Sequence, residues 1–188
     1  MSDTATKILD VGQDLIQTGG YTSMSFQAIA TRVGIKKPSV IHHFPNKSDL
    51  GIAIIQRYRD AFAVQLKAIE NDPQKTAWDA LDFYFSPYRH FANTPNTVCL
   101  CGALAGEIPA LPEELRREVK QFMESQQGWL ERVLREGHRH GEFNLTQTPA
   151  RLSRLFFNTL QGSLLVKRST DDLSQLDDVI QVLIHQLK

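Results

Sequence analysis

The stretch Ser25–Phe44, SFQAIATRVGIKKPSVIHHF, has the pattern of two short helices separated by a glycine. Apolar side chains recur at positions 26, 29, 30 and 33, the spacing that places them on one face of a helix. Ser25 stands where its hydroxyl would cap the first helix, Gly34 suits a positive-φ turn, and Pro38 suits the first turn of the second helix. This pattern is typical of a helix-turn-helix that enters the major groove of DNA. The alternative is a generic helical hairpin with a solvated basic end.

The charge distribution favours a phosphate-binding surface near this stretch. The chain of 188 residues has a formal net charge of zero, which hides a local asymmetry. Four cations and no acid lie between positions 32 and 47: Arg32, Lys36, Lys37 and Lys47. A local basic patch on a neutral protein is the footprint of a domain that touches phosphates at one place. Four charges alone are equally compatible with a solvated face.

Composition and cysteine usage limit the class of protein. The length allows one large domain or two small ones, and the apolar share is that of a globular chain. The start MSDTATKILD has acids where a secretory signal needs cations, and no window approaches the length of a membrane span. Cys99 and Cys101 would point to opposite sides of a helix, which disfavours a mutual disulfide. We therefore expect a reduced cytoplasmic protein that does not enter a membrane.

The remainder of the chain predicts an all-α fold. Apolar residues repeat with helical spacing in segment after segment, and no strand-like alternation is long enough to compete. Outside the helix-turn-helix, the expected helices are Thr4–Thr18, Asn46–Glu70, Lys75–Asn93, Thr97–Ile108, Glu113–His140, Thr148–Arg168 and Asp171–Leu187. Pro87 should kink or split its helix. The wide apolar stripe of the last helix suits simple packing or half of a two-fold helical interface, and the interface is slightly favoured.

The N-terminal third resembles a known family. KILDVGQDLIQTGGYTSMSFQAIATRVGIKKPSVIHHFPNKSDL, residues 7–50, is similar to the DNA-binding domain of the TetR family of transcriptional regulators. The resemblance implies a three-helix DNA-binding domain at residues 1–50 and a larger helical ligand-binding and dimerisation body at residues 51–188. It also implies a homodimer through the two C-terminal helices, double-stranded operator DNA as one partner and a small-molecule effector as another. No cofactor is implied.

The family's DNA-contacting positions carry over to eight residues of this sequence: Ser25, Gln27, Lys36, Lys37, Ser39, His42, His43 and Lys47. Ser25 and Lys47 are expected at helix N-termini, where N–H groups and the positive dipole end attract phosphate. Ser39 and His42 are the better candidates for base edges. The family commonly has tyrosine where this chain has Ile41, so one phosphate contact should be missing or replaced.

An aromatic set in the body suggests an effector site, although such residues more often form core. Tyr84 and Tyr88 lie four apart on one helix face and could present hydroxyls to a ligand. The residues expected to bind the effector are Tyr84, Tyr88, Phe91, Cys99, Phe122, Trp129 and Gln161. No charged cluster joins them, which favours a small, mostly apolar or aromatic ligand.

Residues 98–119, VCLCGALAGEIPALPEELRREV, are similar to a segment of one TetR subgroup. That segment has a Gly-Cys-Leu run followed by Leu-Ala-x-Glu, and in some members its cysteine responds to electrophiles or oxidants. Here Val98 replaces the glycine and Cys99 keeps the cysteine. A buried cysteine is more often an inert small hydrophobe, so both interpretations of Cys99 stay open.

The sequence disfavours catalysis and metal binding. His138 and His140 diverge on a helix and lack further ligands nearby, and no nucleophile elbow, P-loop or dinucleotide fingerprint occurs. The predicted function is that of a ligand-responsive repressor that binds a palindromic operator as a dimer. The alternatives are a redox- or electrophile-sensing repressor that acts through Cys99, and a ligand-independent DNA-binding activator.

Overall fold

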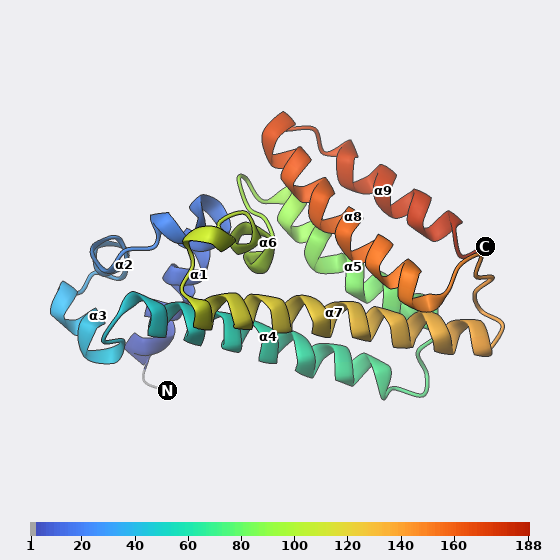
Figure 1. The fold of residues 1–188 in the computed structure, drawn as a ribbon, viewed down its shortest axis with the longest axis horizontal. Coiled ribbons are helices and arrows are strands. Elements are labelled where there is room, and N and C mark those ends of the chain that lie inside the picture. The colour runs from blue at the N-terminus through green and yellow to red at the C-terminus, as the bar shows by residue number, and fades with distance from the viewer. Residues whose placement is uncertain (1–2) are drawn as a thin grey trace. The chain divides into compact units, whose positions relative to one another are not determined.

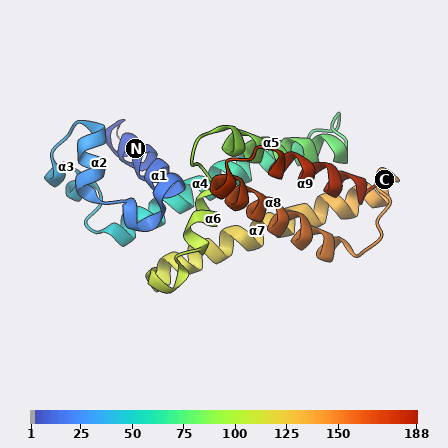
Figure 2. The same ribbon diagram turned by 90° about the horizontal axis from the view of Figure 1, so that it is seen from above.

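The computed structural model describes residues 3–188, and every regular element among them is helical (Figures 1 and 2). The helices are α1 Asp3–Ser23, α2 Phe26–Val33, α3 Lys37–His43, α4 Lys47–Glu70, α5 Ala77–Asn93, α6 Leu100–Ala105, η1 Ile108–Ala110, α7 Glu113–Arg139, α8 Pro149–Thr170 and α9 Ser174–His185. The all-α fold predicted from the periodicity is confirmed. None of these helices is long and apolar enough to cross a bilayer.

The chain forms two compact units. The first contains residues up to Ala61 together with Leu100–Phe122, and the second contains Phe62–Cys99 together with Met123–Lys188. Both α4 and α7 therefore contribute residues to each unit. The functional division predicted at residue 50 concerns DNA and ligand binding rather than compactness, and it stays a prediction.

The core of the first unit fixes α2 and α3 by burying one face of each. Ile29 and Ala30 of α2 and Val40 of α3 are almost completely buried. Both helices pack on α1, whose apolar face is buried as well. A Cβ atom at Gly12 of α1 would lie 2.6 Å from Cδ1 of Ile54, so α1 and α4 approach closely there. These contacts leave α3 with a single buried residue.

Local signals set the boundaries of α2, α3 and α4 as the sequence predicts. The Ser25 hydroxyl accepts a hydrogen bond from the Ala28 N–H at 3.1 Å, which caps α2. Gly34 ends α2 with φ 77° and ψ 33°, and its N–H donates to the Ala30 carbonyl. Asn46 accepts from the Asp49 N–H at 2.8 Å and caps α4. The start of α2, the turn after it and the start of α4 are thus set by local contacts, whereas the N-cap of α3, Lys36, makes no side-chain capping bond.

The regular part of α1 ends at Gly20, two residues beyond the predicted end at Thr18, and a further turn follows the break. The helix continues to Ser23 across this break, where Gly20 has φ 79° and ψ 177°. Residues other than glycine essentially never adopt this backbone conformation. The Ser23 hydroxyl donates to the carbonyls of Leu15 and Gly20, each at 2.7 Å, and so holds the last turn after the break.

The second unit packs α5 against α8 and α9 (Figure 1). A reciprocal capping box of Thr76 and Asp79 starts α5. Pro87 lies inside α5 without dividing it, although the proline deprives the Phe83 carbonyl of its usual N–H donor. The Ser86 hydroxyl donates to that carbonyl at 2.8 Å and compensates for the loss.

We predict that Gly20→Ala lowers the free energy of unfolding by about 2–4 kcal/mol. The substitution imposes a disfavoured conformation, and its Cβ atom would lie 2.0 Å from Oε1 of Glu107. Gly34→Ala is the matched control, because Gly34 also has positive φ but no atom within 4 Å of a new Cβ. The control should cost only about 1 kcal/mol. Urea unfolding followed by circular dichroism measures both, and equal losses would contradict the predicted difference.

Candidate DNA-binding surface and effector site

The proposed DNA-binding residues lie on the outside of α2, α3 and the start of α4. Six of them are exposed: Ser25, Gln27, Lys36, Lys37, Ser39 and His42. His43 and Lys47 are half-buried. Because Val40 is the buried residue of α3, the exposed side chains of this helix are available to an external partner.

The basic patch is smaller than the sequence indicates. Arg32 forms an ion pair with Asp14 of α1 at 2.5 Å, so its charge is used within the first unit. Lys36 and Lys37 form no ion pair with any residue in the described part of the chain, and the first turn of α3 contains no acid. Two lysines at a helix N-terminus would normally repel the positive end of its dipole. A phosphate placed there would relieve that repulsion.

Lys47 occupies a distinct environment at the first residue of α4. Its Nζ atom lies 4.1 Å from the centre of the Tyr21 ring, within the range of a cation–π interaction. Burial lowers the pKa of Lys47, and the negative charge of Glu107 offsets part of that change. Burial also raises the pKa of the Tyr21 hydroxyl. Sequence reasoning identified Lys47 but did not identify either neighbour.

Ile41 is exposed on the surface of α3. Its exposed fraction is 41%, and it lies one turn after Lys37 on the same side of the helix. A branched aliphatic side chain offers no hydrogen-bond donor at a position where a phosphate contact is expected. The isoleucine that replaces the family's common tyrosine therefore lies on the face proposed for DNA.

Ile41→Tyr should strengthen binding to operator DNA by about three- to tenfold, because its hydroxyl would add one hydrogen bond to phosphate. The added group is neutral, so the dependence of affinity on salt should not change. Fluorescence anisotropy over a salt series measures both quantities, and Ile41→Phe controls for aromatic bulk. Equal gains for the two variants would contradict a hydroxyl contact.

Comparison with known proteins identifies the family. A model of bacterial regulatory proteins of the tetR family matches residues 8–54, and a model of the tetracyclin repressor-like C-terminal domain matches residues 78–183. The chain belongs to the TetR family of transcriptional regulators. It is accordingly a DNA-binding regulator and not an enzyme.

Individual TetR relatives resemble the chain over most of its length. Transcriptional regulator AcuR of Cereibacter sphaeroides is 26% identical over 163 residues, which cover 84% of this chain and 73% of AcuR. The HTH-type transcriptional repressor NemR of Escherichia coli is 19% identical over 180 residues, with coverage of 95% and 90%. The crystal structure of a TetR transcriptional regulator from Legionella pneumophila is 31% identical and covers 100% of this chain and 99% of its own, with a TM-score of 0.90.

Five of the proposed effector residues of this TetR protein lie together in the second unit. The rings of Tyr84 and Trp129 stack with centroids 5.3 Å apart, and Tyr88 lies 5.7 Å from Tyr84. The Gln161 amide donates to the Tyr88 hydroxyl at 3.1 Å, so this phenol has a protein partner. Cys99 acts electrostatically on Tyr84 and is 3% exposed. A phenol, an indole and a thiol thus share one buried region.

Two polar atoms of this region lack hydrogen-bond partners among the described residues. They are the Tyr84 hydroxyl and the Trp129 Nε1 group, both buried. Burial raises the pKa of Tyr84 far above its usual value of 10, and a side-chain interaction with the nearby Tyr88 hydroxyl, which falls outside hydrogen-bond geometry, offsets part of the shift. Tyr84 therefore keeps its proton at neutral pH and remains a donor. Each unsatisfied buried donor costs about 1–3 kcal/mol, which an acceptor atom on a ligand would recover.

The other proposed effector residues lie elsewhere. Phe122 belongs to the first unit, where its ring packs 5.4 Å from that of Tyr58. Phe91 is buried near the end of α5, beside the ring of His90. Neither has a ring contact with Tyr84 or Trp129 among the described pairs. Their residue type alone could not distinguish a packing role from a binding role.

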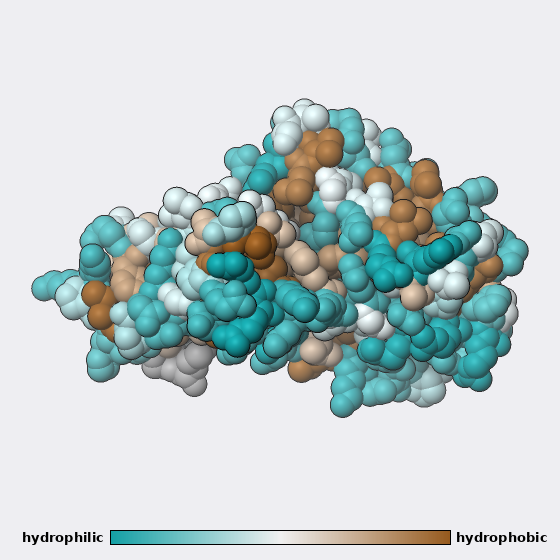
Figure 3. Space-filling model, in the orientation of Figure 1, coloured by the Kyte–Doolittle hydropathy of each residue, from teal (hydrophilic) through white to brown (hydrophobic). Residues whose placement is uncertain are grey.

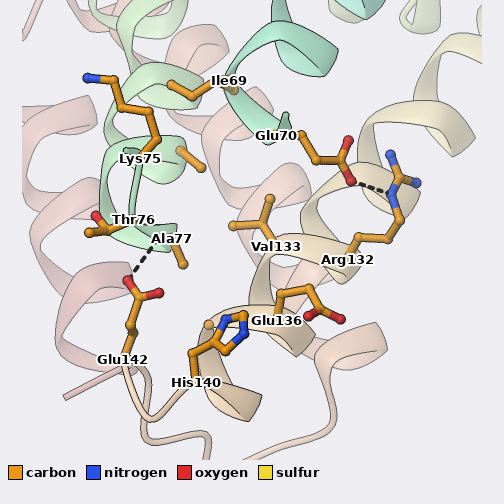
Figure 4. Close-up of a pocket in the computed structure, with 12 residues that line it drawn as sticks. Ile69, Glu70, Lys75, Thr76, Ala77, Arg132, Val133, Glu136, His140 and Glu142 are labelled. Atoms are coloured by element: carbon orange, nitrogen blue, oxygen red, sulfur yellow. Dashed lines mark hydrogen bonds and ion pairs between the residues drawn. The ribbon is translucent and has the colours of Figure 1, made fainter. Parts of the chain in front are cut away.

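Sequence reasoning missed two cavities of the second unit, because residues from different helices form them. Trp129 lines one cavity of about 650 Å³ together with Leu66 and Gln126, and charged side chains also line it: Lys67, Glu70, Glu124 and Arg132. The other measures about 240 Å³ and has a polar lining that includes Glu70, Lys75, Arg132, Glu136, His140 and Glu142 (Figure 4). Its carboxylates are already engaged by the Arg132 guanidinium, the Ala77 N–H and the Arg139 guanidinium. The cavity beside Trp129 is the better candidate for a ligand.

Tyr84→Phe should leave the free energy of unfolding unchanged or raise it by about 1 kcal/mol, because it removes an unsatisfied buried hydroxyl. Tyr88→Phe is the matched control on the same helix. It should lower the free energy of unfolding by about 1 kcal/mol, because the Gln161 amide loses its acceptor. Urea unfolding measures both, and a loss for Tyr84→Phe as large as that for Tyr88→Phe would show that the hydroxyl is satisfied.

Proposed function

We propose that this TetR protein is a ligand-responsive repressor that binds a palindromic operator as a homodimer. The observation that carries the proposal is the outward surface of α3, where Val40 is the buried residue and Lys36 and Lys37, which form no ion pair within residues 3–188, stand at the N-terminus. Phosphate contacts would come from Ser25, Lys36, Lys37 and Lys47. Ser39 and His42 would read base edges, with Gln27 and His43 beside them.

The C-terminal helices support the homodimer. Large apolar side chains of α8, α9 and their connection stay exposed: Leu155, Leu165, Val166, Leu173 and Val182. Figure 3 shows hydrophobic patches over the region of these helices. A second copy that packs the same helices against them would bury these groups in a two-fold interface. The dimer would then present two copies of α3 about 34–36 Å apart, the spacing of successive major grooves.

The effector is proposed to bind at Tyr84 and Trp129. Two buried donors without partners favour a small aromatic or apolar molecule that carries at least one acceptor oxygen. The cavity of about 650 Å³ beside Trp129 has the volume of a typical small-molecule site. A ligand that prefers a conformer with differently spaced recognition helices would release the operator by shifting the population.

A sensor that acts through Cys99 is the second candidate. The likeness to NemR, named as a transcriptional repressor, favours repression but leaves the signal open. Cys99 is almost completely buried, which restricts the access of oxidants and electrophiles to its thiol. We therefore favour non-covalent effector binding. Release by a thiol reagent that persists in Cys99→Ser would remove the Cys99 alternative.

The proposed division of labour predicts different behaviour for two alanine variants. Lys47→Ala should weaken binding to all sequences alike and flatten the plot of log affinity against log salt by about one unit. His42→Ala should relax base preference at one position and leave that slope unchanged. Operator DNA from the gene's own upstream region, tested with single-base variants by anisotropy, measures both effects. Uniform losses for both variants would contradict the assignment.

Light scattering supplies the complementary control for the dimer. The protein should be dimeric at micromolar concentration, and Val182→Glu should shift it toward the monomer and reduce operator binding. A wild-type monomer that binds the operator tightly would overturn the palindromic model.

A further inference from the structure

Glu107 places a carboxylate from the segment after α6 against the end of α1. Its Oε1 atom accepts a hydrogen bond from the Tyr21 N–H at 2.7 Å. Its Oε2 atom accepts from the Thr22 hydroxyl at 2.7 Å and from the Thr22 N–H at 3.3 Å. All of these residues belong to the first unit. One side chain thus joins two segments more than eighty positions apart in the sequence.

The end of α1 is shaped to receive this carboxylate. At Gly20 the helix adopts φ 79° and ψ 177°, and the next two N–H groups leave the regular helical ladder and donate to Glu107. Successive backbone N–H groups arranged in this way form a concave binding site for an anion. A Cβ atom at position 20 would lie 2.0 Å from Oε1, so only glycine leaves room. The N–H groups freed by the break in α1 are therefore bound by the Glu107 carboxylate.

The Tyr21 ring connects this anion site to Lys47. Nζ of Lys47 lies 4.1 Å from the ring centre. A Cβ atom at Gly51, one turn further along α4, would lie 3.3 Å from Cε2 of the same ring. The ring thus rests against the first turns of α4. The hydrogen bond from the Tyr21 N–H to the Glu107 carboxylate therefore fixes the residue whose ring Lys47 covers.

The negative charge of Glu107 also favours the charged form of Lys47. Burial beside Tyr21 acts in the opposite direction and disfavours that form. A lysine must be charged to release a counterion from phosphate on binding. Glu107 therefore supports both the position and the charge of this ammonium group.

Other ion pairs already hold the first unit together. Arg57 of α4 pairs with Asp10 of α1 at 2.7 Å, and Arg59 pairs with Glu118 of α7 at 2.7 Å. Both arginines lie more than two helical turns along α4 from Lys47. Glu107 differs from these ion pairs because it binds Tyr21, the residue whose ring Lys47 covers.

We propose that Glu107 is a positioning residue for operator binding. It fixes the Gly20–Thr22 break and, through the Tyr21 ring, holds the charged Lys47 where it meets a phosphate. The inference rests on the proposed role of Lys47 at the operator. It assigns to Glu107 an effect on DNA affinity without any contact to DNA.

The test combines Glu107→Gln with Lys47→Ala in a double-mutant cycle on the full-length protein. Glutamine removes the charge and replaces one acceptor oxygen with an NH2 group that cannot accept from the backbone. Glu107→Gln should reduce operator affinity about five- to tenfold and flatten the salt slope by about one unit, as Lys47→Ala does. The double variant should be no weaker than Lys47→Ala alone, because both changes remove the same phosphate contact.

Glu118→Gln is the matched control. This variant also removes a carboxylate that pairs with α4 in the first unit, at Arg59 and Gln56. It should leave the salt slope unchanged. Circular dichroism of each variant at the assay temperature establishes that the protein is folded.

Three results would overturn the inference. Additive losses with an unchanged slope for Glu107→Gln would assign Glu107 a structural role only. A gain in affinity would show that its charge merely opposes the DNA. A slope unaffected by Lys47→Ala would remove the contact that Glu107 is proposed to position. In each of these cases the wild type still binds its operator, whereas failure of the wild type to bind any upstream fragment would contradict the proposed function itself.

Discussion

The left-handed turn at Gly34 and the burial of Val40 fix the orientation of α3 on its supporting helices. Gly34 reverses the chain without strain, and Val40 anchors α3 by one fully buried side chain. A seven-residue helix has little intrinsic stability in water, so its geometry comes from this packing. The exposed side chains of α3 are then available for recognition, while His43 stays half-buried. The positions of Lys36, Lys37, Ser39 and His42 all depend on that one constraint.

Much of this arrangement could be predicted because its causes are local. The cap at Ser25, the turn at Gly34 and the apolar face with Leu50, Ile54 and Tyr58 use residues within a few positions of one another. Helical periodicity and capping chemistry express such short-range constraints directly in the sequence. The wide stripe of α9 was visible for the same reason. The sequence could not separate the apolar residues of this stripe that pack inside the protein from those that stay exposed; the structure separates them.

The contacts that shape the sites could not be predicted, because they join distant segments. Glu107 meets Tyr21 across 86 positions, and Trp129 of α7 stacks on Tyr84 of α5. The break in α1 falls at the second of two adjacent glycines, but nothing local shows that a carboxylate would bind there. The aromatic residues were similarly ambiguous. Phe122 and Trp129 are both aromatic residues on the apolar face of α7, yet Trp129 stacks on Tyr84 whereas Phe122 packs against Tyr58.

Both sites use unsatisfied or irregular polar groups in a chain that is otherwise regular. At Gly20 the backbone leaves the helix, and an internal carboxylate takes up the freed N–H groups. At Tyr84 and Trp129 no described residue takes up the buried donors. The energetic consequence differs accordingly, since a satisfied site stabilises one conformation while an unsatisfied site favours any conformation or ligand that supplies an acceptor. In the proposed mechanism the first site would define the DNA-binding state and the second would be completed by a small molecule.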